Sequence, residues 1–164
     1  MKKFDKKEQI KIIKIILIVI WMVVEFNFSN QGGTKSSGTS SKVTKVIVNI
    51  VVREEDKLTE TQMENIEKVV RKCAHYTIYT IGGVLIINYV YTMDKTKKQK
   101  ILISLLFGTF YAVIDEVHQF FVPGRSAQVL DVGIDTLGVL TGILIYVGIA
   151  SLVEKLIAQK NAVN

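Results

Sequence analysis

The sequence has one cysteine, one proline and two histidines among its 164 residues. The single cysteine, Cys73, excludes an intramolecular disulfide framework, and the single proline, Pro123, argues against a disordered proline-rich linker. Charge is also missing from four long stretches, which are residues 15–24, 73–93, 101–114 and 136–153. Because a helix needs about 20 mostly apolar residues to cross a bilayer, these stretches exclude a large water-soluble core.

The fold class that this pattern predicts is all-α, with the chain forming a polytopic membrane protein of one domain, residues 1–164. The four predicted transmembrane helices are residues 11–28, 73–93, 101–121 and 132–153. Gly138 and Gly142 form a small-xxx-small pair in the last span, which is typical of closely packed helices. We expect the lipid bilayer to be the main partner of the chain.

The long loop between the first two spans, residues 29–72, carries two local signals. Apolar residues recur at helical spacing over residues 43–51, which predicts a short amphipathic helix at the extracellular membrane surface. Thr59 and Gln62 have the spacing of a capping box, which predicts that a helix begins there. Residues 29–70 have six positive and six negative side chains, so no nucleic-acid partner is expected.

Lysine and arginine are distributed unevenly along the chain. Twelve of the 21 lie before or at the start of the first span, between the second and third, or after the fourth, and these regions share one side of a membrane crossed four times. The positive-inside rule assigns that side to the cytoplasm, so both termini of this multi-pass cell-membrane protein are expected there. The start of the chain also resembles a signal peptide, but the bulky sequence Phe26-Asn27-Phe28 disfavours cleavage.

Polar side chains collect at the predicted outer end of the spans. They are Arg71, Lys72 and His75 in the second span, Asp115, Glu116, His118 and Gln119 in the third, Arg125 in the turn, and Asp131 and Asp135 in the fourth. Glu25, near the outer end of the first span, is a further candidate for this group. Helical spacing puts the residues of each span on one face or on neighbouring faces. We therefore predict that His75, Asp115, His118, Arg125 and Asp131 surround one outward-opening pocket.

Several roles fit such a pocket. The candidates for acid/base catalysis are His118, Glu116, Asp115 and His75, and the candidates for ligand binding are Arg71, Lys72, Arg125, Gln119, Asp131 and Asp135. Both histidines with Asp115 and Asp131 could ligate a divalent metal, but nothing resembles a dense ligand motif, so no metal or cofactor is expected. Alternatively the cluster is structural, with Arg71 and Arg125 neutralising the acids.

Two of these segments resemble the VanZ-like family. The first runs from Asp115 to Ser126 (DEVHQFFVPGRS) and continues from Asp131 to Gly138 (DVGIDTLG); the second runs from Arg71 to Tyr79 (RKCAHYTIY). A weaker match begins at Phe28. Ile78 stands where many relatives have an acid, so any role of that acid in the family is not carried over to this chain. Asp135 stands where Asn is common.

The resemblance implies a small bacterial membrane protein of about four spans. The family is named for low-level resistance to teicoplanin, a glycopeptide that binds cell-wall precursors outside the membrane, and it is not established as an enzyme family. Three functions are open: a non-enzymatic factor that lowers glycopeptide susceptibility, an enzyme that modifies a lipid head group or cell-wall precursor, and a transporter. The transporter is the weakest, because the acids lie near one end of the spans rather than at the midplane.

Overall fold

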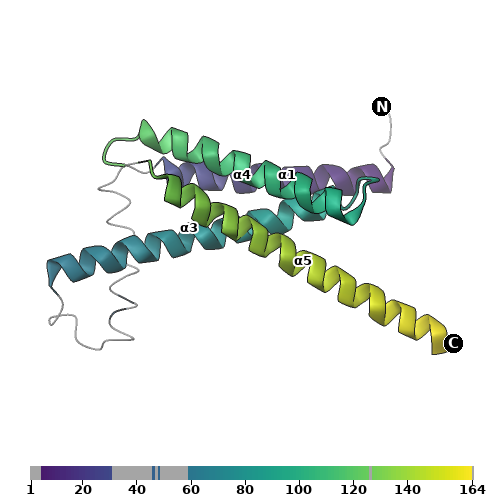
Figure 1. Ribbon diagram of the computed structural model, residues 1–164. Coiled ribbons are helices and arrows are strands. Elements are labelled where there is room, and N and C mark those ends of the chain that lie inside the picture. The colour runs from purple at the N-terminus through teal and green to yellow at the C-terminus, as the bar shows by residue number, and fades with distance from the viewer. Residues whose placement is uncertain (1–4, 31–45, 47, 49–58, 126, 164) are drawn as a thin grey trace.

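The computed structural model describes residues 5–30, 46, 48, 59–125 and 127–163 of the chain. Within these residues every regular element is helical, as predicted, and no strand occurs. The long helices are α1 (Lys6–Ser29), α3 (Glu60–Val90), α4 (Lys97–Phe120) and α5 (Val129–Val163). Figure 1 shows that each runs opposite to the one before it, so α1 begins and α5 ends toward the same end of the bundle.

Three of these helices begin with a capping box. Asp5, Thr59 and Thr96 each cap a helix with the side chain, and the Glu or Gln three residues later accepts a hydrogen bond from the backbone N–H of the cap. These reciprocal bonds satisfy backbone donors that a helix start otherwise leaves unpaired. The box predicted at Thr59 and Gln62 is confirmed, and α3 therefore begins well before the predicted span at residue 73.

All four helices are long and apolar enough to cross a membrane. The ends differ in detail from the predicted spans: α3 ends at Val90 and α4 at Phe120, whereas α5 continues to Val163. Large apolar side chains such as Ile13, Phe110 and Leu144 are exposed on the helix surfaces. Such a surface favours aggregation in water but matches the hydrocarbon of a bilayer.

The short amphipathic helix predicted over residues 43–51 lies largely outside the described residues. Of this stretch the structure describes Val46 and Val48, both helical. Val48 is buried and Val46 is exposed. The position of the segment at an extracellular membrane surface stays a prediction.

The most extensive helix contact joins α3 to α5, which cross in Figure 1. Glycines let the two backbones approach: a Cβ on Gly142 would lie 2.0 Å from the carbonyl oxygen of Thr80, and one on Gly138 would lie 2.5 Å from that of Tyr76. Only a residue without a side chain fits such a contact. The predicted role of this glycine pair in helix packing is confirmed.

Aromatic side chains fix α1 against α3 and α4. The indole N–H of Trp21 donates to the carbonyl of Ile78 at 2.9 Å, and the phenol of Tyr111 donates to the carbonyl of Met22 at 2.7 Å. The rings of Trp21 and Tyr111 lie 5.1 Å apart, centroid to centroid. Because residues four apart share a helix face, this packing also turns Glu25 of α1 toward the bundle interior.

Candidate functional site

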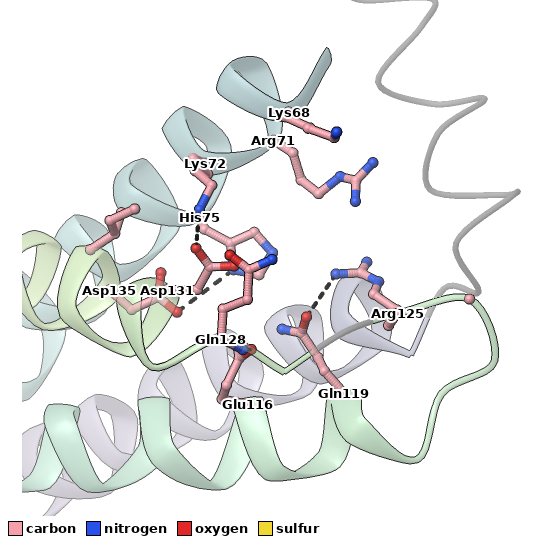
Figure 2. Close-up of a pocket in the computed structure, with 12 residues that line it drawn as sticks. Lys68, Arg71, Lys72, His75, Glu116, Gln119, Arg125, Gln128, Asp131 and Asp135 are labelled. Carbon is pink, nitrogen blue, oxygen red and sulfur yellow. Dashed lines mark hydrogen bonds and ion pairs between the residues drawn. The ribbon is translucent and has the colours of Figure 1, made fainter. Parts of the chain in front are cut away.

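A cavity of about 250 Å³ opens at the end of the bundle where α4 ends and α5 begins. We call it the polar cavity. Four cationic side chains from α3 and the α4–α5 turn line it (Figure 2): Lys68, Arg71, Lys72 and Arg125. The remaining polar lining comes from α3, α4, the turn and α5: His75, Glu116, Gln119, Gln128, Asp131 and Asp135.

The α4–α5 turn is what brings Arg125 to the cavity. Gly124 takes a positive φ of 77°, a left-handed conformation that glycine adopts without steric cost. The backbone N–H of Arg125 then closes the turn onto the carbonyl of Val122 at 3.1 Å. The turn thus directs the Arg125 side chain back over the ends of α1 and α4.

The guanidinium of Arg125 joins two helices. Its Nη1 donates to Oε1 of Gln119 at 3.0 Å, and its Nη2 donates to the carbonyl of Phe28 at 3.1 Å. In Figure 2 the guanidinium of Arg71 lies across the opening from that of Arg125. Burial lowers the pKa of Arg125, and the charge of Arg71 lowers that pKa further. Two cations therefore share one opening, where an anion would reduce their repulsion.

The acids that line the polar cavity link the helices. Lys72 of α3 forms an ion pair with Asp131 of α5, and the carboxylate of Glu116 accepts a hydrogen bond from the backbone N–H of Gln128. The ion pair of Lys72 with Asp131 adds a lysine to the two arginines that the structural alternative names. These contacts hold α3, α4 and α5 around the opening (Figure 2).

A second group of acids is almost completely buried and lies around His75, which lines the polar cavity. The exposed fractions are 1% for Glu25, 2% for Asp115 and 1% for Asp135. The ring nitrogen Nδ1 of His75 lies 3.4 Å from Oε1 of Glu25 and 3.8 Å from Oδ2 of Asp135. Gln119 donates to Oδ2 of Asp115 at 2.9 Å. We call Glu25, His75, Asp115 and Asp135 the buried acid–histidine cluster.

The comparisons with known proteins agree with this architecture. The model of the family described as VanZ/LLP1 matches residues 14–153, which include all of α3 and α4, most of α1 and α5, and every residue of the polar cavity. The chain belongs to the VanZ/LLP1 family. No curated protein and no solved structure matches it.

In this VanZ/LLP1 family member, eight of the ten predicted site residues line the polar cavity. The other two, Asp115 and His118, are not among the lining residues. Asp115 lies in the buried cluster with Glu25 and His75. The ring of His118 stacks on Phe26 of α1, with 4.4 Å between centroids. The structure therefore divides the predicted single pocket: His75, Arg125 and Asp131 line it, Asp115 belongs to the buried cluster, and His118 packs against α1.

Two polar residues of the cavity were absent from the predicted set. Lys68 precedes Arg71 by three residues on α3, a spacing that puts both on one helix side. Gln128 follows the turn and is uncharged, so the charge pattern gives no signal for it. Glu25, the one acid of the predicted first span, joins the polar groups of the other spans through His75, and an acid in an apolar span is itself a signal of function.

Proposed function

We propose that this VanZ/LLP1 family member binds the anionic head group of a lipid or lipid-linked cell-wall precursor in the polar cavity, on the extracellular side of the membrane. Through this binding it lowers the susceptibility of the cell to glycopeptides such as teicoplanin. The observation that carries the proposal is that Arg71 and Arg125 face one opening from two different parts of the fold. A phosphate or carboxylate accepts paired hydrogen bonds from guanidinium groups and neutralises their charge.

The size of the polar cavity favours a head group over the antibiotic itself. Sites for drug-sized ligands measure about 300–1,000 Å³, and the polar cavity, at about 250 Å³, is smaller than that. A glycopeptide is larger than a drug-sized ligand and does not fit. The apolar surfaces of the surrounding helices suit the acyl chains of a lipid whose head group occupies the cavity.

The test compares full-length variants in two assays. One assay measures teicoplanin susceptibility of a bacterial strain that expresses the protein. The other measures retention of anionic phosphatidylglycerol, against neutral phosphatidylcholine, by native mass spectrometry of the purified protein. Arg71→Gln is expected to lose most of the protection and to retain anionic lipid at least tenfold less well. Lys98→Gln, an exposed lysine at the opposite end of the bundle, is the matched control.

Two results decide the proposal. If Arg71→Gln accumulates normally and still protects cells and retains anionic lipid like the wild type, the proposal is wrong. If Arg71→Gln fails to accumulate, Lys68→Gln replaces it, because the Lys68 side chain is 56% exposed and forms an ion pair with Glu64 on its own helix. Loss of protection and of anionic lipid in either variant, with normal Lys98→Gln, supports the proposal.

A second candidate function is an enzyme that modifies the bound head group by acid/base chemistry. The position of Glu116 and His75 in the cavity wall, beside the cationic opening, favours it. Mass spectrometry of lipids and muropeptides, with and without expression, distinguishes the two functions. A new product that disappears in Glu116→Gln supports an enzyme, whereas an unchanged product set with altered susceptibility supports a binding protein.

A further inference from the structure

The buried acid–histidine cluster brings side chains from all four long helices together. One carboxylate oxygen each of Glu25 and Asp115 and one ring nitrogen of His75 lie within 4.8 Å of one another. These residues belong to α1, α4 and α3, and Asp135 of α5 approaches the same nitrogen of His75. The cluster lies outside the group of cations that carries the proposed head-group binding.

Three carboxylate oxygens of this cluster are buried and accept no hydrogen bond. They are Oε1 of Glu25, Oδ1 of Asp115 and Oδ1 of Asp135. A buried carboxylate oxygen without a partner is costly, and three acids in one small volume repel each other when ionised. His75 and Arg125 are the nearby basic groups, but neither donates a hydrogen bond to these three oxygens.

We propose that Glu25, His75 and Asp115, with Asp135 beside them, bind one divalent transition-metal ion such as Mn²⁺ or Zn²⁺. The donor set is one imidazole nitrogen and up to three carboxylate oxygens, a mixture that these ions accept. A dication also balances most of the negative charge that the acids carry. The ion would bind to the oxygens that lack hydrogen-bond donors.

The dimensions of the cluster suit such an ion. Ligand atoms about 2.1 Å from a tetrahedral metal lie about 3.4 Å apart, so atoms within 4.8 Å of one another need to approach by at most about 1.4 Å. Nδ1 of His75 already lies 3.4 and 3.8 Å from the carboxylates of Glu25 and Asp135. The proposal therefore requires side-chain rotations of about an ångström when the ion binds.

Gln119 orients one of the proposed ligands. Its amide nitrogen donates to Oδ2 of Asp115, which leaves Oδ1 without a hydrogen-bond partner, and its amide oxygen accepts from Arg125. Such outer hydrogen bonds are what fix ligand carboxylates in metal sites. The hydrogen bonds from Arg125 to Gln119 and from Gln119 to Asp115 also connect the opening of the polar cavity to the proposed ion.

The chain offers a matched control for each kind of ligand. It has two histidines, and His118 stacks on Phe26 instead of facing the cluster. Glu116 is a buried acid next to Asp115 in sequence, but it accepts from Gln128 at the cavity wall. His75→Gln is therefore paired with His118→Gln, and Asp115→Asn with Glu116→Gln.

The experiment uses the full-length protein in detergent, purified without a polyhistidine tag and stripped with a chelator. Mn²⁺ is added without any anionic lipid, and binding is followed by electron paramagnetic resonance. We expect one tightly bound Mn²⁺ per chain, displaced by Zn²⁺, with spin-echo modulation from a coordinated nitrogen. Glu25→Gln, His75→Gln and Asp115→Asn should each weaken binding by roughly tenfold or more, and the two controls by less than about twofold.

Three outcomes would overturn the proposal. They are a wild-type protein that retains neither Mn²⁺ nor Zn²⁺, bound Mn²⁺ without nitrogen modulation, and controls that lose binding as much as the cluster variants. If a cluster variant does not fold, the nitrogen signal of the wild type and its loss in His75→Gln decide the question. Because no anionic ligand is present, this experiment can fail while the proposed head-group binding holds, and the reverse.

Discussion

Arg125 joins parts of the chain that are distant in sequence. It donates to Gln119 on α4 and to the backbone of Phe28 at the end of α1, at 3.0 and 3.1 Å. Lysine has a single ammonium group and cannot reproduce this forked geometry. We expect Arg125→Lys to fold but to lower the free energy of unfolding by about 1–3 kcal/mol. Thermal unfolding in detergent measures the loss; Lys98→Arg should change nothing, and equal stability of Arg125→Lys would contradict the assigned contacts.

Asp115 and His118, which do not line the polar cavity, show how far helical spacing predicts the position of a side chain. Asp115 and His118 are three residues apart, and successive residues of a helix turn by about 100°, so their directions differ by about 60°. That difference is enough for Asp115 to face His75 while His118 reaches Phe26. Spacing placed both at one end of one helix, but which neighbouring helix each would meet depends on packing that a single helix does not encode.

At the scale of elements, local signals predicted the helices well. Uncharged apolar stretches located the four long helices, and the Thr59–Gln62 pair located the start of α3. The positions of the other ends were less predictable, because good helix formers such as Glu154, Lys155 and Leu156 continue α5 past the uncharged stretch. Sequence position marks Glu25 as a candidate, but its burial in the bundle depends on Trp21 fixing the rotation of α1.

The crossing of α3 and α5 depends on glycine. A methyl group on Gly142 would meet the Thr80 carbonyl oxygen at 2.0 Å, and that oxygen belongs to a helix backbone that cannot turn aside. Gly142→Ala is expected to lower the free energy of unfolding by about 1–3 kcal/mol. Gly148→Ala on the same helix has open space around it and should be neutral or stabilising. Equal melting temperatures of the two variants would show that the helices do not pack this closely.

At the scale of the whole molecule, the two ends of the bundle differ in charge pattern. The cations of the polar cavity lie among acids, whereas the opposite end carries more lysines than acids, as in the first turn of α4, which has Lys97 and Lys98 but no acid. A helix start disfavours cations, because its own dipole is positive there. Lysines at that position therefore do not stabilise α4. The positive-inside rule explains them if this end of the bundle faces the cytoplasm.

This asymmetry predicts that the polar cavity faces the outside of the cell and that both termini lie in the cytoplasm. The test replaces Cys73, the one native thiol, with serine and adds single cysteines at two exposed positions: Ala127→Cys in the α4–α5 turn and Lys98→Cys at the opposite end. A membrane-impermeant maleimide applied to intact cells should label Ala127→Cys at once, and Lys98→Cys only after the membrane is opened. The reverse labelling pattern would show that the cavity faces the cytoplasm, where it could not bind a cell-wall precursor on the outer surface. That result would contradict both the predicted orientation and the proposed function.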